Sequence, residues 1–176
     1  MRSIRFIAAS LLACAAVPLW GQTFGPPISG MCLLSRASAI GASRVGQSMQ
    51  AQIKQMQAML KGELAQRRAV ADQQRRALEA QRNATAPIEY QRQLAALDQQ
   101  ARVLEQQQNA RYIAAQAKGQ QQIDQTLGEA LTRVITRKAC SAILERDQSY
   151  GWNNQMDITG EVANEMDVIL KTVAIQ

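Results

Sequence analysis

The sequence contains no histidine, and only 4% of its 176 residues are aromatic. Without histidine the chain can form neither a Ser-His-Asp triad nor a metal site with imidazole ligands. No glycine-rich phosphate loop follows a predicted strand, and the carboxylates occur singly rather than as a pair in a recognisable pocket. We therefore expect no enzymatic activity, no bound metal and no cofactor.

Apolar runs long enough to cross a membrane are also lacking. Residues 1–22 have the form of a secretory signal, because Arg2 and Arg5 precede an apolar run over residues 6–19 that is too short to span a bilayer. We expect this segment to be removed and the mature protein to lie in the bacterial periplasm. Cys14 is an alternative site of lipoprotein anchoring, but we favour cleavage because apolar residues continue past it.

Two long apolar stripes at helical spacing fill the middle of the chain, over residues 45–78 and 94–134. Their period near 3.5 residues is typical of helices wound on each other. Only a short break at residues 85–87 separates them. The sequence therefore predicts an antiparallel coiled-coil hairpin arm over residues 36–138, with its tip at the break. Folding there would place Leu78 against Leu94 and Met49 against Ile123.

The predicted arm is weakly packed, because much of its seam is alanine, glutamine or glycine. We expect one helix to begin after Ser35 or Ser38, with weak first turns at Gly41 and Gly46. Two glutamine tracts, at residues 106–108 and 120–122, interrupt the second stripe. We interpret these tracts as solvated helix faces rather than recognition motifs.

Short apolar runs at both ends of the arm predict a small β body. Residues 23–35 contain the first strand, and residues 139–176 contain the returning strand and a terminal helix. Residues 147–154 are expected to form a turn or loop, with a brief strand at residues 150–152 as the alternative. The fold class is thus mainly α with a small β base that brings both chain ends together. The residues assigned to this body and to oligomer contacts are Met31, Leu33, Ile143, Leu144, Ile158 and Val162.

Two cysteines remain after removal of the signal, and both lie in the predicted body. Cys32 is on the first strand, and Cys140 is at the start of the second. If these strands are neighbours, the two residues can form a disulfide, which persists in an exported protein. Two buried thiols in a small core are the alternative.

Charge is divided unevenly between the arm and the body. Residues 36–138 carry 16 basic and 8 acidic side chains, whereas residues 139–176 carry 2 basic and 6 acidic ones. A basic helix often binds nucleic acid, but export and the scarcity of stacking aromatics argue against this partner. Anionic lipid headgroups, lipopolysaccharide and unfolded acidic polypeptides remain as partners. A solvated face that keeps the arm soluble is the alternative.

Three motifs, in order, resemble the Skp (OmpH-like) family of periplasmic chaperones. They are Met-Cys-Leu-Leu-Ser-Arg at residues 31–36, Cys-Ser-Ala-Ile-Leu-Glu-Arg at residues 140–146, and Asp-Ile-Thr-Gly-Glu-Val at residues 157–162. The resemblance covers nearly the whole mature chain, although residues 147–156 are shorter than the corresponding family segment.

The resemblance implies a jellyfish-like homotrimer in which three bases join as a small β-barrel and three arms surround a cavity. Such proteins hold unfolded outer-membrane proteins without ATP. The client-binding residues expected on this basis are Arg67, Arg68, Arg75, Arg76, Arg82, Arg92, Arg102 and Arg111. The alternative function is a structural or adaptor coiled-coil component of a periplasmic secretion or envelope apparatus, which would bind one folded partner.

Overall fold

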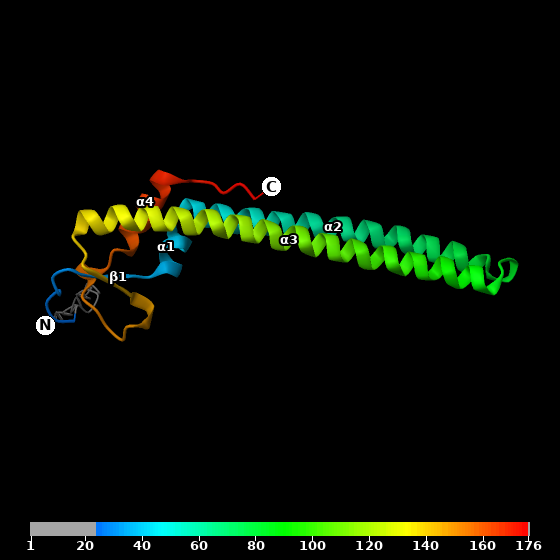
Figure 1. Cartoon of the computed structure of the whole chain (residues 1–176), viewed down its shortest axis with the longest axis horizontal. Coiled ribbons are helices and arrows are strands. Elements are labelled where there is room, and N and C mark those ends of the chain that lie inside the picture. Colours follow the sequence, from blue (N-terminus) through cyan, green and yellow to red (C-terminus); the bar gives the residue numbers. More distant parts are fainter. Residues whose placement is uncertain (1–23, 176) are drawn as a thin grey trace, which may run out of the picture.

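Two long helices that run in opposite directions side by side dominate the fold (Figure 1). A computed structural model describes residues 24–175, so the predicted signal segment and Cys14 lie outside the described residues. Helix α2 (Arg44–Ala80) leads outward, and helix α3 (Pro87–Lys138) returns. The 3-10 helix η1 (Arg82–Ala84) forms the tip between them, and Pro87 occupies the first turn of α3, where its missing N–H costs no hydrogen bond.

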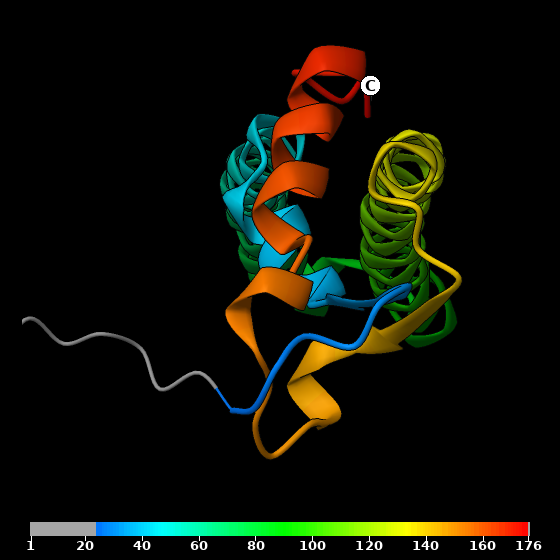
Figure 2. The same cartoon turned by 90° about the vertical axis from the view of Figure 1, so that its left-hand side faces the viewer.

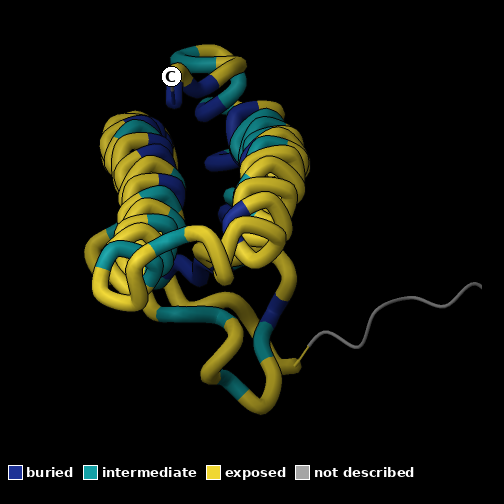
Figure 3. Tube along the Cα trace, turned by 90° about the vertical axis from the view of Figure 1, so that its right-hand side faces the viewer, coloured by how far each residue is buried: buried dark blue, intermediate teal, exposed yellow. Residues whose placement is uncertain are grey.

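The two apolar stripes face each other along the contact between α2 and α3 (Figure 3). Leu60 and Leu78 of α2 are each 8% exposed, and Ile123 of α3 is 2% exposed, whereas most residues between the stripe positions are exposed. The stripes therefore contact each other because their spacing keeps one side of each helix apolar.

A parallel pair of short strands lies at the opposite end from the tip. Strand β1 (Met31–Leu34) pairs with β2 (Ala142–Glu145) so that Cys32 lies opposite Ile143. On the other side of β1, the backbone N–H of Ile158 donates to the carbonyl oxygen of Leu33 over 2.9 Å. This two-stranded sheet on a mainly helical chain confirms the predicted fold class in outline.

The turn or loop predicted around residues 150–152 is confirmed, and the alternative of a brief strand there is wrong. This segment forms a loop between the 3-10 helices η2 (Arg146–Gln148) and η3 (Asn154–Met156). Its neighbour Asn153 donates from its side chain to the carbonyl oxygen of Gly25 over 2.7 Å. The free edge of β1 is taken instead by Asp157, so the loop has no strand to pair with.

The single helix predicted to begin after Ser35 or Ser38 is divided in two. Helix α1 (Arg36–Ala42) is capped by Ser35, and the chain bends at Ser43 before α2 begins. The Ser43 hydroxyl accepts from the N–H of Gly46 over 3.1 Å and donates to the carbonyl oxygen of Ile40 over 2.8 Å. A Cβ atom on Gly46 would lie only 1.9 Å from that same carbonyl oxygen, so the bend depends on glycine.

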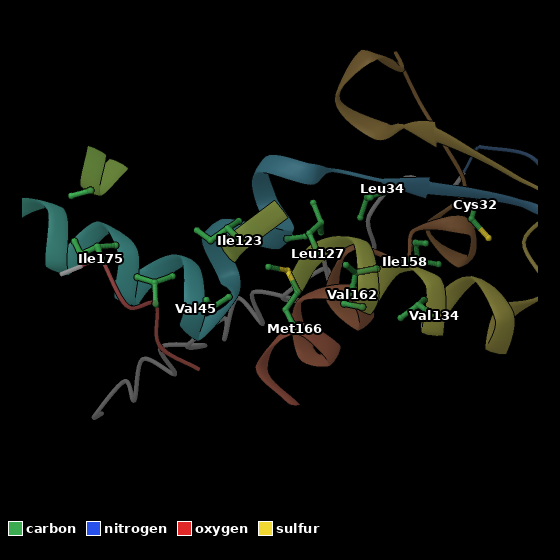
Figure 4. Packing of buried hydrophobic residues seen from close by; sticks show 14 residues of the cluster. Cys32, Leu34, Val45, Ile123, Leu127, Val134, Ile158, Val162, Met166 and Ile175 are labelled. Atoms are coloured by element: carbon green, nitrogen blue, oxygen red, sulfur yellow. The ribbon is translucent and has the colours of Figure 1, made fainter. Parts of the chain in front are cut away.

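The hydrophobic core lies at the strand end, where helix α4 (Thr159–Ile169) packs against α1 and α3 (Figures 2 and 4). Val45 at the start of α2, Val134 near the end of α3, and Val162 and Met166 of α4 are all fully buried there. We call this part of the molecule the body, and the parts of α2 and α3 that extend beyond it the arm. None of the helices in the described part of the chain is long and apolar enough to cross a membrane.

Candidate functional site

The arm contains open hollows between its helices, because small and polar residues occupy much of the seam. One hollow of about 380 Å³ is bordered by Leu64, Arg67, Leu97 and Leu104. A second of about 420 Å³ lies nearer the body and is lined by Leu60, Lys61, Leu64, Gln108 and Tyr112, among others. These hollows give the arm apolar surface that is accessible from solvent.

Gln108 is the most unusual residue of the second hollow. Its side chain occupies a seam position and is only 7% exposed, yet its Oε1 atom has no hydrogen-bond partner. The Gln108 side chain forms a hydrogen bond with Glu63. This hydrogen bond and the nearby Arg111 guanidinium lower the pKa of Glu63 below its ordinary value, although desolvation acts to raise it. The seam beside this hollow thus contains a buried hydrogen-bond acceptor that has no partner.

A column of cations follows one flank of α2 at intervals of seven residues and ends in η1 at the tip. It consists of Lys54, Lys61, Arg68, Arg75 and Arg82. Arg68 reaches across to Glu105 of α3, with the guanidinium and carboxylate 2.5 Å apart, and Arg75 is paired in the same way with Asp98. Among the described residues, Lys54 and Lys61 form no ion pair, so the column is neutralised in its outer half and positively charged nearer the body.

Two other arginines predicted to bind a client, Arg92 and Arg111, are also paired with carboxylates, whereas Arg102 contacts only a neutral amide. Arg111 of α3 pairs with Glu63 of α2 over 3.3 Å, and Arg92 pairs with Glu89 of its own helix over 3.2 Å. Arg102 donates to the Gln99 side chain over 3.0 Å.

At the tip, Arg82 lies 5.7 Å from the centre of the Tyr90 ring and pairs with Glu79 over 3.3 Å. The Tyr90 hydroxyl donates to Glu79, which raises the pKa of Tyr90 and lowers that of Glu79. These contacts join the end of α2 to the start of α3.

Each adjacent arginine pair of α2 is therefore divided between two environments. Arg68 and Arg75 bridge to α3, whereas Arg67 and Arg76 are exposed and make no ion pair within the described part of the chain. The sequence reasoning grouped all four as one positive side and missed Lys54 and Lys61. Counting by seven from Arg68 toward the N-terminus would have found both lysines.

The body contains a polar network that links β1, η2 and the start of α4. The Ser35 hydroxyl donates to Asp147 over 2.5 Å, and the Ser35 N–H donates to the Thr159 hydroxyl over 2.9 Å. Arg146 pairs with Asp157 over 2.9 Å. The hydrogen bond from Ser35 is the main reason that the pKa of Asp147 lies below its ordinary value.

The body residues predicted from the sequence fall into three groups. Leu33, Ile158 and Val162 are buried within the chain itself, at 3% exposure or less. Met31 and Ile143 are half-buried. Leu144 is 48% exposed on β2, which has β1 on one side and no strand on the other among the described residues.

Cys32 and Cys140 lie together in the structure, joined as a disulfide with their Cα atoms 5.8 Å apart. Cys140 does not begin the second strand, as the sequence suggested, but precedes it in the turn after α3. Ala139 ends that helix in the left-handed conformation, with φ of 53°, and so directs Cys140 back toward β1.

Comparison with known proteins identifies the class. The family model of OmpH, outer membrane protein (OmpH-like), matches residues 31–166, which include both strands and all four α-helices except the last three residues of α4. The chain therefore belongs to the OmpH-like family, as the sequence resemblance predicted. No curated protein matches the chain.

One solved structure is similar over most of its length. It is the crystal structure of a Caulobacter crescentus protein assigned as an outer membrane chaperone (OmpH-like), at 2.83 Å resolution. The two chains are 27% identical, with a TM-score of 0.76, and the alignment covers 89% of this chain and 94% of the other. Both comparisons thus lead to an OmpH-like chaperone family, with long helices on a small sheet.

Proposed function

We propose that the protein is an ATP-independent holdase of the periplasm that binds unfolded outer-membrane proteins and prevents their aggregation. The observation that carries the proposal is the open seam of the arm, where apolar hollows lie beside cations that have no ion-pair partner. An unfolded chain has exposed apolar side chains and backbone groups, and many weak contacts along such an arm would lower its free concentration.

The chemistry of the hollows supports adaptable rather than specific binding. Met59 is 52% exposed and Val70 is also 52% exposed, so both offer apolar contacts outside the seam. Methionine is flexible and fits differently shaped partners. Met56 and Leu60, by contrast, are less exposed than Met59 and contribute to packing of the helices.

The unpaired cations give the arm its attraction for acidic clients. We assign this role to Arg67, Arg76 and Arg102 of the predicted arginine set, and we add Lys54 and Lys61. The same side chains could bind anionic lipid or lipopolysaccharide, whose phosphate groups are recognised by similar contacts. We assign Arg68, Arg75, Arg82, Arg92 and Arg111 mainly to ion pairs within the arm.

We further propose that the working form is a homotrimer with its three arms around a cavity. The unpaired edge of β2 and its exposed residue Leu144 support an intermolecular sheet, because an open edge with an apolar side chain favours pairing with another strand. In this arrangement each arm would be a coiled-coil hairpin, and all three arms would extend from one shared β body.

The first experiment combines two measurements on one sample of the mature protein. Light scattering gives its mass, and turbidity then records aggregation of a urea-unfolded outer-membrane β-barrel diluted into buffer without nucleotide. We expect a trimer that suppresses aggregation at about one trimer per client. A substitution of Leu144→Asp should lower the mass to that of a monomer, because a charge on the free strand edge opposes pairing.

Gln148→Asp is the matched control for Leu144→Asp, since Gln148 is an exposed residue of the neighbouring η2. A monomeric protein with no effect on client aggregation would refute the holdase proposal. It would leave the envelope adaptor as the working function, which predicts binding to one folded partner instead.

A further inference from the structure

The last residues of the described chain lie as an extended strap beside α2 and α3 where the arm leaves the body (Figures 1 and 2). We define the strap as residues 170–175. Val173 and Ile175 are 4% and 5% exposed, whereas Ala174 between them is exposed. This alternation is that of an extended strand with one buried side. The strap lies beyond residues 31–166, which match the family model.

Two glutamines hold the backbone of the strap, one from each long helix. The Gln122 amide of α3 donates to the carbonyl oxygen of Ala174 and accepts from its N–H, each over 2.9 Å. The Gln52 amide of α2 donates to the carbonyl oxygen of Val173 over 2.8 Å. Because these contacts are made to the backbone, they do not depend on which side chains the bound segment carries.

A notch between the helices receives the apolar side chains. Gly119 of α3 lacks the Cβ atom that would lie 3.0 Å from Ile175 and 3.3 Å from Met49 of α2. Beyond Ile175, a hollow of about 190 Å³ continues along α2 and is lined by Gln52, Gln55, Met56 and Met59. The strap therefore fills only one part of a longer groove.

We propose that this groove is a binding site for extended peptide segments with an apolar side chain at every second residue, and that the strap occupies it in the resting chain. We call it the root groove and define it by Met49, Gln52, Met56, Gly119 and Gln122. The inference rests on the proposed function, because a strand segment of an unfolded β-barrel client is a peptide of this kind. Such a client would displace the strap and bind in its place.

The test uses the full mature chain with Val173→Ser and Ile175→Ser, which removes both buried apolar side chains of the strap and so weakens its hold on the groove. A labelled peptide with the sequence of residues 171–176 is then added, and its binding is measured by fluorescence anisotropy. We expect binding to this variant to be at least about tenfold tighter than to the parent chain, in which the tethered strap competes at a high effective concentration. A peptide with the positions of Val173 and Ala174 exchanged has the same composition but no alternation, and should bind weakly.

Gln122→Ala, added to the variant with Val173→Ser and Ile175→Ser, should weaken peptide binding by about tenfold, since two hydrogen bonds are lost. Gln121→Ala is the matched control, because Gln121 is an exposed neighbour in the same tract. Failure of the folded variant to bind the peptide, or equal binding of both peptides, would overturn the inference. Far-UV circular dichroism establishes that the variant is folded.

Hydrogen exchange at the Ala174 N–H of the unaltered chain gives a second readout that needs no substitution. This exchange should be slow in the chain alone and faster when the peptide is added in large excess, and unchanged exchange at saturation would also overturn the inference. If the chain binds the peptide but does not suppress aggregation, the root groove is supported and the holdase proposal is refuted. If the chain suppresses aggregation but binds no peptide, the holdase proposal is supported and the root groove is refuted.

Discussion

Arg68 of α2 and Glu105 of α3 form an ion pair across the arm, with their charged atoms 2.5 Å apart, and Arg75 and Asp98 repeat this relationship one heptad nearer the tip. Arg67 and Arg76 are the sequence neighbours of the two arginines and extend into solvent instead. Adjacent residues of one helix point in different directions, so each arginine pair contains one residue that joins the helices and one that is free to meet a partner.

The first prediction separates these two roles. Arg67→Gln with Arg76→Gln should weaken client binding and reduce its dependence on salt, while the thermal unfolding of the arm stays nearly unchanged. Arg68→Gln with Arg75→Gln should lower arm stability by up to about 1 kcal/mol per pair, because exposed ion pairs contribute little. Titration of an unfolded client at two salt concentrations, with calorimetry of each variant, measures both effects. An equal loss of client affinity in the two double variants would contradict this division.

A pair of glycine substitutions tests the bend between α1 and α2. Gly46→Ala should destabilise the chain by about 1–3 kcal/mol, because the new methyl group would collide with the Ile40 carbonyl oxygen. Gly62→Ala is the control, since a Cβ at this exposed site in α2 would meet nothing within 4 Å apart from its chain neighbours and the backbone of its own helix. It should stabilise the helix by about 0.5–1 kcal/mol. Urea unfolding of both variants gives the two differences, and a neutral effect of Gly46→Ala would refute the role of glycine at the bend.

Gln108→Leu should raise the stability of the arm by about 1 kcal/mol or more. The substitution removes a buried acceptor without a partner and places an apolar side chain beside Leu60 and Leu64. Part of this gain is offset by loss of the hydrogen bond to Glu63. A rise in melting temperature is the expected result, and Gln107→Leu, at an exposed neighbouring position, serves as the control. A lower melting temperature for Gln108→Leu would mean that its contact with Glu63 outweighs the unpaired oxygen.

Acid should destabilise the body through Asp157 and Asp147. Burial tends to raise the pKa of Asp157, but hydrogen bonds from Thr159 and the Arg146 guanidinium outweigh it and hold this pKa below its ordinary value. The unfolded chain then binds more protons than the folded one below about pH 5. The stabilisation is therefore present at neutral pH and is lost as pH falls below about 4, toward the lower pKa of the folded state. Urea unfolding between pH 7 and pH 3 measures this loss. Asp157→Asn should reduce the dependence of the unfolding free energy on pH. If this dependence is unaltered in the variant, the acid sensitivity comes from other residues.

The Cys32–Cys140 pair predicts sensitivity to reduction. We expect no free thiol in the native mature protein, and two after unfolding in reductant. The pair spans 108 residues of sequence, and the chain-entropy account predicts a stabilisation of up to about 4–5 kcal/mol for a disulfide closing a loop of this size. Urea unfolding with and without reductant measures it, and the variant with serine at both positions should not respond to reductant. Two free thiols in the native protein would contradict the prediction.

The local parts of the fold follow from the sequence, whereas the contacts between distant parts do not. Stripe residues such as Leu60 and Ile123 could be placed because burial on a helix leaves a regular spacing. The bend at Ser43 could not, because it depends on close approach of Gly46 to Ile40. The second neighbour of β1, the segment at Asp157, was missed for a similar reason, since one backbone hydrogen bond leaves no pattern in the surrounding residues.

The candidate site shows the same limit. The sequence identified a basic arm correctly by composition, but only the facing side of α3 decides that Arg68 is paired and Arg67 is not. Gln122 looked like a solvated residue because it lies in a tract of three glutamines. Its hydrogen bonds to Ala174 join residues 52 positions apart, and the strap has only two buried apolar residues, too few to stand out by periodicity.

The parallel pairing of β1 with β2 determines the order in which the molecule can fold. The partner of Met31 is Ala142, so the first strand cannot pair until the segments of both α2 and α3 have been synthesised. Closing so long a loop is costly in chain entropy, whereas the contacts near the tip join residues close in sequence and can form early. We therefore expect α2 and α3 to pair first near the tip and then progressively toward the body, with the sheet forming last.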